Sequence, residues 1–262
     1  MKNCLFCRNK IISETEEHII PESLGNNNLI VSGVVCNKCN NGILSDLDNY
    51  FCHNNLFAET KMFYVDKTKK GKFPKILTLN GTIEKIDKNK TKLTQNIKTQ
   101  NNFLIKTTEN CWEFCFNIIK RGINPHKISQ FLTKVGIESL FHFQDEIAYN
   151  NIFDEAREYT IGIMKNKFIP FSWKKTNKNK VGIFISELVN DKSEKYYIST
   201  LRLYNCDYFI QLNDPFNPVA LNVFNNKYNL NYINDNKQIV PNLLKNSIKF
   251  NLVPINKALT II

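Results

Sequence analysis

The pattern of apolar and polar positions changes along the chain and predicts an α+β protein. Near the N-terminus, short apolar runs lie on either side of a turn-forming segment at 25–28, which predicts two β segments joined by a loop. The second of these strands is expected over 31–35. A helix should then open at Asn40, because apolar residues recur at helical spacing at Ile43, Leu44, Leu47 and Phe51.

The middle of the chain alternates between the two periodicities. Residues 61–110 predict short antiparallel strands at 61–65, 75–79 and 82–86, with Asn80-Gly81 as a hairpin turn. The segment 85–100, rich in Lys, Asn and Thr, is expected to be exposed. Residues 111–164 predict three helices, and from residue 181 onward strands follow. The helices are expected at 112–119, 126–143 and 153–163, and the strands at 181–189, 196–204 and 207–212.

Length and composition favour a globular protein with a sizeable core, because the chain has 262 residues of which 42% are hydrophobic. The change of pattern predicts a first domain over 1–58 (the head) and a second α+β domain over 59–262 (the body). No apolar leader follows Met1 and no run of 18 apolar residues occurs. We therefore expect a soluble, cytoplasmic protein with no membrane partner.

The positive charge is concentrated in the body. The formal net charge is +11, but residues 1–60 carry −3 and the remaining residues +14. Attraction to a phosphate backbone must therefore come largely from the body. The densest mixture of basic and aromatic residues lies at 165–180, where a nucleic-acid contact and a solvated loop are the two interpretations. Its lysines are Lys165, Lys167, Lys174, Lys175, Lys178 and Lys180.

Two Cys-x-x-Cys pairs, Cys4/Cys7 and Cys36/Cys39, indicate a structural zinc site. Four thiolates in two such knuckles suit one tetrahedral Zn²⁺ ion. A pair of disulfides is the alternative, and it is disfavoured because a Cys-x-x-Cys loop is tight and nothing else in the chain looks secreted. Of the other cysteines, Cys111 and Cys115 have helical spacing and are interpreted as small buried residues.

The residues between the two cysteine pairs carry a resemblance to a known family. Glu17-His18-Ile19-Ile20-Pro21, then Asn28-Leu29, then Asn40 after the second pair, follow in the order seen in the HNH (ββα-metal) endonucleases of the zinc-stapled kind. The resemblance covers about the first 50 residues. It implies a ββα-metal head that hydrolyses phosphodiester bonds in nucleic acid, more readily DNA than RNA.

The resemblance also implies a role for each site residue. His18 would be the general base, since an imidazole titrates near working pH. Glu17 and Asn40 would supply oxygen ligands to a catalytic Mg²⁺ or Mn²⁺ ion. Asn28 would orient the imidazole. Asn27 and Asn26 are the alternatives in register for this last role, and Glu17 stands where many relatives have Asp.

Each of these residues also has a structural interpretation. His18 could be a buried histidine of a small zinc module, and Asn40 and Asn41 could be helix caps. Asp46 and Asp48 could add metal ligands, although a solvated helix face is the favoured interpretation for both.

The sequence thus favours an HNH endonuclease, of the kind that serves in restriction or anti-phage defence. One alternative is a non-catalytic zinc ribbon that binds nucleic acid. Another is a nuclease that is silent until a ligand or partner activates it. The body is expected to recognise DNA, to form a homo-oligomer or to bind an activating protein.

Overall fold

The computed structural model describes a little over two thirds of the chain. The described residues are 2–13, 15–24, 28–53, 65, 67, 71–78, 81–87, 90–95, 104–108, 111–115, 124–214, 216–217, 220, 231–233, 239–241, 251–253 and 259–261. By internal packing the chain divides into two compact units. The first comprises Met1–Pro21, Asn26–Phe51 and Asn124–Ile262, and the second comprises Glu22–Gly25 and Cys52–Ile123. The predicted domain boundary at 58/59 lies outside the described residues and stays a prediction.

The head has the strand–strand–helix order that the sequence predicts. Strand β1 (Glu16–His18) pairs antiparallel with β2 (Ile30–Ser32), and a short 3-10 turn, η1 (Glu22–Leu24), lies between them in sequence. The helical segment begins at Asn37, three residues before the predicted start, as α1 (Asn37–Cys39). It continues as a π-helical turn, η2 (Asn40–Leu44), and then as α2 (Ser45–His53). Gly42 has non-helical backbone angles, which kink the segment just after Asn40.

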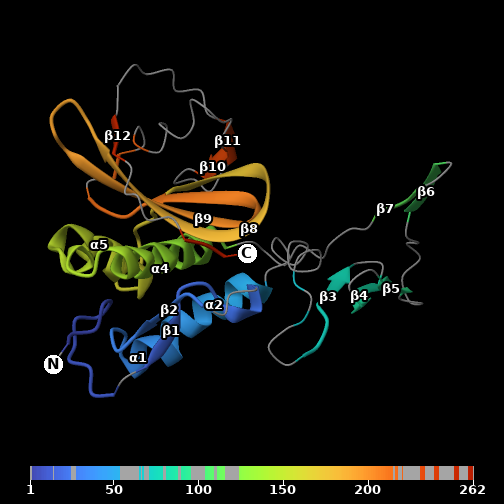
Figure 1. The fold of residues 1–262 in the computed structure, drawn as a ribbon, viewed down its shortest axis with the longest axis horizontal. Helices are drawn as coiled ribbons and strands as arrows, with labels where there is room; N and C mark the ends of the chain where they lie inside the picture. Colours follow the sequence, from blue (N-terminus) through green and yellow to red (C-terminus); the bar gives the residue numbers. More distant parts are fainter. Residues whose placement is uncertain are drawn as a thin grey trace. The chain divides into compact units, whose positions relative to one another are not determined.

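Helix α4 (Pro125–Phe143) is the central element of the first unit, and its bounds agree with the predicted helix at 126–143. Asn124 caps its N-terminus by accepting hydrogen bonds from the backbone N–H groups of His126 and Lys127, and Pro125 occupies the first turn. Two 3-10 turns, η3 (Ile147–Tyr149) and η4 (Asn151–Phe153), lead into α5 (Asp154–Thr160). Figure 1 shows α4 and α5 between a long β-hairpin and the elements of the head.

The hairpin consists of β8 (Phe171–Val189) and β9 (Lys195–Gln211), paired antiparallel with an irregularity between Lys175 and Lys180. Short strands extend this sheet: β10 (Asn231–Ile233) and β11 (Ile239–Pro241) on one path, with β12 (Asn251–Val253) and β13 (Leu259–Ile261) also pairing with β8. The strands predicted at 181–189, 196–204 and 207–212 are confirmed in part, because the last two form one continuous strand, β9, and β8 begins ten residues before the predicted start. The interpretation of 165–180 as a loop is therefore wrong over 171–180.

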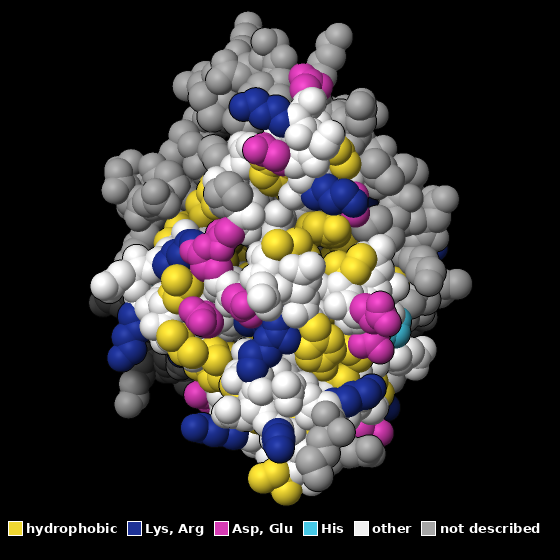
Figure 2. Space-filling view, turned by 90° about the vertical axis from the view of Figure 1, so that its left-hand side faces the viewer, with side chains coloured by type: hydrophobic (Ala, Val, Ile, Leu, Met, Phe, Trp, Pro, Cys, Tyr) yellow, Lys and Arg dark blue, Asp and Glu magenta, His cyan; other side chains and the backbone are white. Residues whose placement is uncertain are grey.

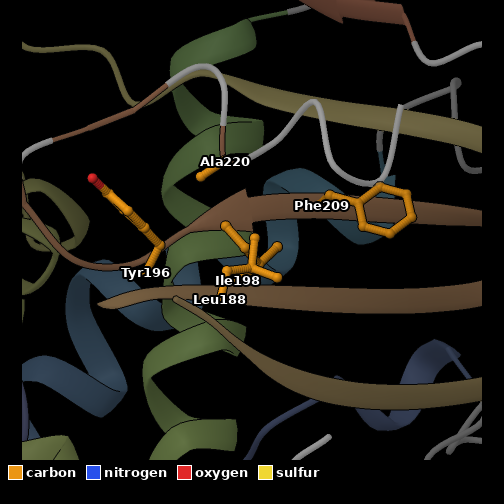
Figure 3. Close-up of a cluster of buried hydrophobic side chains, with 5 residues drawn as sticks. All are labelled: Leu188, Tyr196, Ile198, Phe209 and Ala220. Atoms are coloured by element: carbon orange, nitrogen blue, oxygen red, sulfur yellow. The ribbon is translucent and has the colours of Figure 1, made fainter. Parts of the chain in front are cut away.

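Both faces of the hairpin are covered. On one face α4 approaches β9 so closely at Gly136 that a Cβ there would come within 2.9 Å of the Ser199 Cβ. The next residue, Ile198, points to the opposite face because side chains alternate along a strand. There it joins a buried hydrophobic cluster, drawn in Figure 3, of Leu188, Tyr196, Ile198, Phe209 and Ala220.

The described strands of the second unit are antiparallel. β3 (Lys75–Thr78), β4 (Gly81–Asp87) and β5 (Lys90–Gln95) form a three-stranded sheet. β6 (Leu104–Thr108) pairs with β7 (Cys111–Cys115). The strands expected at 75–79 and 82–86 are confirmed, and the strand expected at 61–65 lies outside the described residues except for Val65.

The helix predicted from residue 112 is wrong over the described part of that segment, because Cys111–Cys115 is the strand β7. The physical reason is an ambiguous pattern. In the sequence CWEFCF the large aromatic residues stand at every second position, which fits a strand as well as a short apolar helix. The interpretation of Cys111 and Cys115 as one helical face is corrected with it.

The helix predicted at 153–163 is confirmed in a shorter form as α5. Among the described residues, no helix has both the length and the apolar content needed to cross a membrane.

Candidate functional site

Cys4, Cys7, Cys36 and Cys39 come together as a thiol cage at the start of the head. Their four Sγ atoms all lie within 4.8 Å of one another, and those of Cys7 and Cys36 are 3.6 Å apart. All four are free thiols. Four sulfurs at the corners of a tetrahedral zinc site would be about 3.8 Å apart. The cage therefore fits a single four-coordinate metal ion.

The backbone around the cage holds the two knuckles together. Leu5 N–H donates to the Val34 carbonyl at 2.7 Å, and Cys36 N–H donates to the Cys4 sulfur at 3.3 Å. The hydrogen bond with Cys39 and the backbone donors lower the pKa of the Cys4 thiol to about 4. A thiolate is the form of cysteine that binds metals. The pKa of Cys7 is raised by burial and that of Cys39 by its hydrogen bond with Cys4, so the thiolate form is favoured at Cys4 alone among these three cysteines.

Strand β1 presents its three residues to different surroundings. Side chains alternate along a strand, so Glu16 and His18 share one face and Glu17 points to the other. Glu16 is exposed and His18 half-buried, whereas Glu17 is only 5% exposed. The two residues that the sequence places together in the site, Glu17 and His18, therefore leave β1 in opposite directions.

His18 ends β1, opposite Ile30 of β2. Its Nδ1 atom is buried although the ring as a whole is half-buried, so the imidazole is oriented with one nitrogen inward. The sequence assigns Asn28 to orienting this ring. Asn28 is exposed and lies two residues before β2, near the end of β1 where Ile19 N–H donates to the Leu29 carbonyl at 3.0 Å.

Asn40 lies against β1. Its Nδ2 atom donates to the Glu16 carbonyl oxygen at 3.1 Å, which places the amide two residues from His18 along the strand. Asn40 is not an N-cap, because the helical segment already begins at Asn37 with Cys36 in that position, but it does close α1 as its C-cap, with its backbone N–H donating to the Asn37 carbonyl. The structure therefore brings Asn40 to the strand that carries His18.

Glu17 is held by a residue that the sequence analysis missed. Lys134 of α4 is completely buried, and its Nζ lies 2.6 Å from Glu17 Oε1 and 2.9 Å from Asp48 Oδ1. The same Nζ donates to the His18 carbonyl oxygen at 3.2 Å, and Glu138 Oε2 lies 3.7 Å away. We call Lys134, Glu17, Asp48 and Glu138 the lysine cluster.

Burial and charge oppose each other within the lysine cluster. Burial alone would lower the pKa of Lys134, but Glu138, Asp48 and Glu17 outweigh it and hold that pKa above its ordinary value. Burial raises the pKa of Asp48 to about 6 although Lys134 acts against it. Burial likewise raises the pKa of Glu138 well above its usual range. Lys134 therefore keeps its charge, while Glu138 favours its neutral form.

The favoured expectation that Asp46 and Asp48 lie on a solvated helix face is only half right. Asp46 is exposed, but the Asp48 side chain is 21% exposed and its two oxygens accept from Lys134. The sequence did contain a signal for this cluster. Between 128 and 140 the only charged residues are Lys134 and Glu138, one helical turn apart in an otherwise apolar and small stretch.

The lysines at 165–180 fall into different environments. Lys165 and Lys180 are exposed. Lys167 forms ion pairs with Glu155 and Asp214, and Lys174 lies 3.9 Å from Asp207 with its ammonium group 5.3 Å from the centre of the Phe209 ring. The side chains of Lys175 and Lys178 lie outside the described residues. On the face drawn in Figure 2, basic and acidic side chains are interspersed among the described residues.

Comparison with known families supports the assignment of the head. Residues 4–56 match the family model described as HNH endonuclease. Comparison with curated proteins and with solved structures finds no significant match. The match spans both knuckles, β1, β2 and α2, which include the thiol cage and the His18 strand. Residues 4–56 therefore form a domain of the HNH endonuclease family.

Proposed function

We propose that this protein is a metal-dependent endonuclease that hydrolyses phosphodiester bonds in DNA. The observation that carries the proposal is the docking of the Asn40 amide on β1 at the Glu16 carbonyl. It brings a neutral oxygen ligand to the strand that carries His18, two residues away from it, within the segment that matches HNH endonucleases. A zinc ribbon that only binds nucleic acid has no need of this pairing.

His18 is the proposed general base. Its inward Nδ1 leaves Nε2 as the nitrogen that accepts a proton from the attacking water. The water then attacks the phosphorus in line with the leaving 3′ oxygen. Asn28, at the entrance to β2, is the proposed residue that orients the ring.

Asn40 and Glu17 are the proposed ligands for a catalytic Mg²⁺ or Mn²⁺ ion. Asn40 donates through Nδ2, so its Oδ1 is the ligand atom. Glu17 bonds Lys134 through Oε1 and leaves β1 on the face opposite to His18, so its role as a ligand rests on the resemblance and stays a prediction. When bound, the divalent ion supplies neutralisation of the charge that develops on the phosphate and the leaving oxygen.

Zn²⁺ is the proposed occupant of the thiol cage. Four sulfur donors suit a soft or borderline cation, whereas Mg²⁺ and Mn²⁺ prefer oxygen. The two metals therefore have separate roles and separate ligands. The cage holds the knuckles together, and the ion at Asn40 serves the reaction.

Lys165 and Lys180 are the proposed DNA contacts among the lysines at 165–180 whose side chains are described, because both are exposed. Lys167 and Lys174 already have acidic partners, so their charges are partly neutralised within the protein. Lys175 and Lys178 stay predictions. So does a role in restriction or anti-phage defence.

The test is nicking of supercoiled plasmid by the full-length protein with Mg²⁺, with Mn²⁺ and with neither. We expect metal-dependent nicking that is lost in His18→Ala while the thiol-bound metal content stays unchanged. His142→Ala is the matched control, because His142 is exposed at the end of α4, far in sequence from the head.

Equal nicking by wild type and His18→Ala would refute the role of His18. DNA binding without nicking by either protein would instead favour the non-catalytic zinc ribbon or a nuclease that awaits an activator. Adding cell lysate to the assay separates these two outcomes: nicking that appears in wild type but not in His18→Ala favours a nuclease that awaits an activator, and its absence favours the zinc ribbon.

A further inference from the structure

Lys134 of α4 is a fully buried lysine whose contacts are mainly with residues of the head. A lysine is almost never fully buried unless it is paired, and Lys134 is 0% exposed. An ammonium group has three donors. Here they are directed at Glu17, at Asp48 and at the His18 carbonyl, all of which belong to the head. Lys134, a residue of the body, thus places one positive charge against β1.

The three acceptors lie on the two elements that bound the site. Glu17 and the His18 carbonyl belong to β1, and Asp48 belongs to α2. The helical segment that ends as α2 also carries Asn40 near its start. A single ammonium group therefore fixes the separation between the strand of the general base and the helical segment of the metal ligand.

Stability does not require a charge at this place. A buried ion pair gains little net free energy over well-packed apolar residues, because both charges must be removed from water. Apolar packing is already present nearby, since the Phe51 ring of α2 stacks on Phe131 of α4 with centroids 3.8 Å apart. Apolar packing therefore already holds α2 against α4, and the contribution of Lys134 to packing does not explain why a charged residue is buried here.

We propose that Lys134 is a positioning residue of the nuclease site. It holds Glu17 and the His18 backbone in place from beneath β1, so that head and body form one catalytic unit. The inference rests on the proposed function and adds to it a residue from outside the segment that matches the family. Lys134 does not touch the substrate and acts only through Glu17, Asp48 and the backbone of His18.

The test compares Lys134→Met, Glu17→Gln and the double variant in the full-length protein. Residues that orient metal ligands typically contribute about 10–100-fold to activity, and we expect a loss of kcat in that range for Lys134→Met with KM nearly unchanged. Because Lys134 acts partly through Glu17, we expect the double variant to lose less kcat than the product of the two single losses.

A second readout is independent of activity. In protein that holds the thiol-bound metal but no Mg²⁺, Lys134→Met should raise the hydrogen-exchange rates of the β1 amides. Arg157→Met is the matched control. Arg157 is also a buried cation of the body, but it bonds Asp154 and the carbonyls of Ala148 and Asn150 and not β1. We expect this control to lose stability and to keep its kcat and its β1 exchange rates.

Lys134→Gln keeps a donor and loses the charge, so it serves as the second variant if Lys134→Met does not fold. The proposal is overturned if either folded variant keeps the wild-type kcat. It is also overturned if the losses from Lys134→Met and Glu17→Gln multiply, or if Arg157→Met lowers kcat equally. If His18→Ala loses nicking while Lys134→Met nicks normally, only the role of Lys134 is refuted. Equal nicking by His18→Ala and wild type would refute the proposed function itself.

Discussion

The thiol cage and the lysine cluster solve the same problem in two ways. In each site, side chains that can be negatively charged surround one position for a positive charge. Each site also connects segments that are separate in the sequence. The cage needs a cation from outside, whereas the lysine cluster uses the protein's own ammonium group. The cage spans residues 4–39 and the cluster spans residues 17–138. The cage is built from one short segment, so it can bind or release its metal independently of the rest of the protein. The lysine cluster includes a residue from a distant helix, so it forms only when the whole first unit is folded.

The largest expected effect is loss of the cage. Cys39→Ser removes one of four ligands, and structural zinc contributes about 10–16 kcal/mol of binding free energy to small zinc domains. We expect the head to unfold in the variant, with loss of the bound metal and of all nicking. Metal content and circular dichroism measure this.

Cys206→Ser is the matched control for Cys39→Ser, because Cys206 is a half-buried cysteine on β9 outside the cage. A Cys39→Ser protein that keeps its metal and its fold would contradict the assignment of the cage as structural.

A smaller effect concerns pH, to which the two sites should respond with opposite signs. Acid protonates thiolates and so weakens metal binding in the cage. Asp48 has a folded-state pKa of about 6, above its ordinary value of 3.8, so the folded protein binds this proton more tightly than the unfolded chain. Its contribution to the free energy of unfolding therefore increases as the pH falls from about 6 to 4.

Asp48→Asn removes this gain. We expect the free energy of unfolding of the wild type, relative to Asp48→Asn, to be larger at pH 5 than at pH 7 by about 1 kcal/mol. Urea unfolding at both pH values, with the metal content held constant, measures the difference. Asp46→Asn is the control, since Asp46 is exposed on the same helix. An identical pH dependence of wild type and Asp48→Asn would contradict the prediction.

The smallest effect is expected where the cage meets the body. Arg8 Nη2 donates to the Tyr149 carbonyl at 2.7 Å and lies 3.3 Å from Asp154, with both charged side chains partly exposed. Exposed ion pairs contribute at most about 1 kcal/mol, so Arg8→Gln should cost less than that in unfolding free energy. Metal content should not change. Loss of the metal from Arg8→Gln would show that the body supports the cage as it supports β1.

What the sequence could predict follows the same division. The cage, the strand–strand–helix order of the head and the helix at 126–143 depend on spacing within short segments, and each was predictable. The lysine cluster was not, because no local pattern tells which element will cover β1. Lys134 stands in an apolar helical stripe where a charge looks like an exception, and only the folded chain shows Glu17 and Asp48 beside it.

The errors also have local causes. Cys111–Cys115 is a strand because an alternating aromatic pattern in so short a run fits either period. Asp48 was expected in solvent because aspartate side chains are mostly exposed and ordinarily lie on the solvated face of a helix. Neither case could be decided without knowing the neighbour across the fold.

The close approach of α4 to β9 at Gly136 has a consequence for how this gene could be recombined. Even a methyl group at this position would collide with Ser199, so the helix that carries Lys134 is matched to its own sheet. We expect a head fused to a foreign body to keep the thiol cage and to lose the contacts that Lys134 makes with β1. On the proposed role of Lys134, an active chimera needs α4 and the β8–β9 hairpin together with the head.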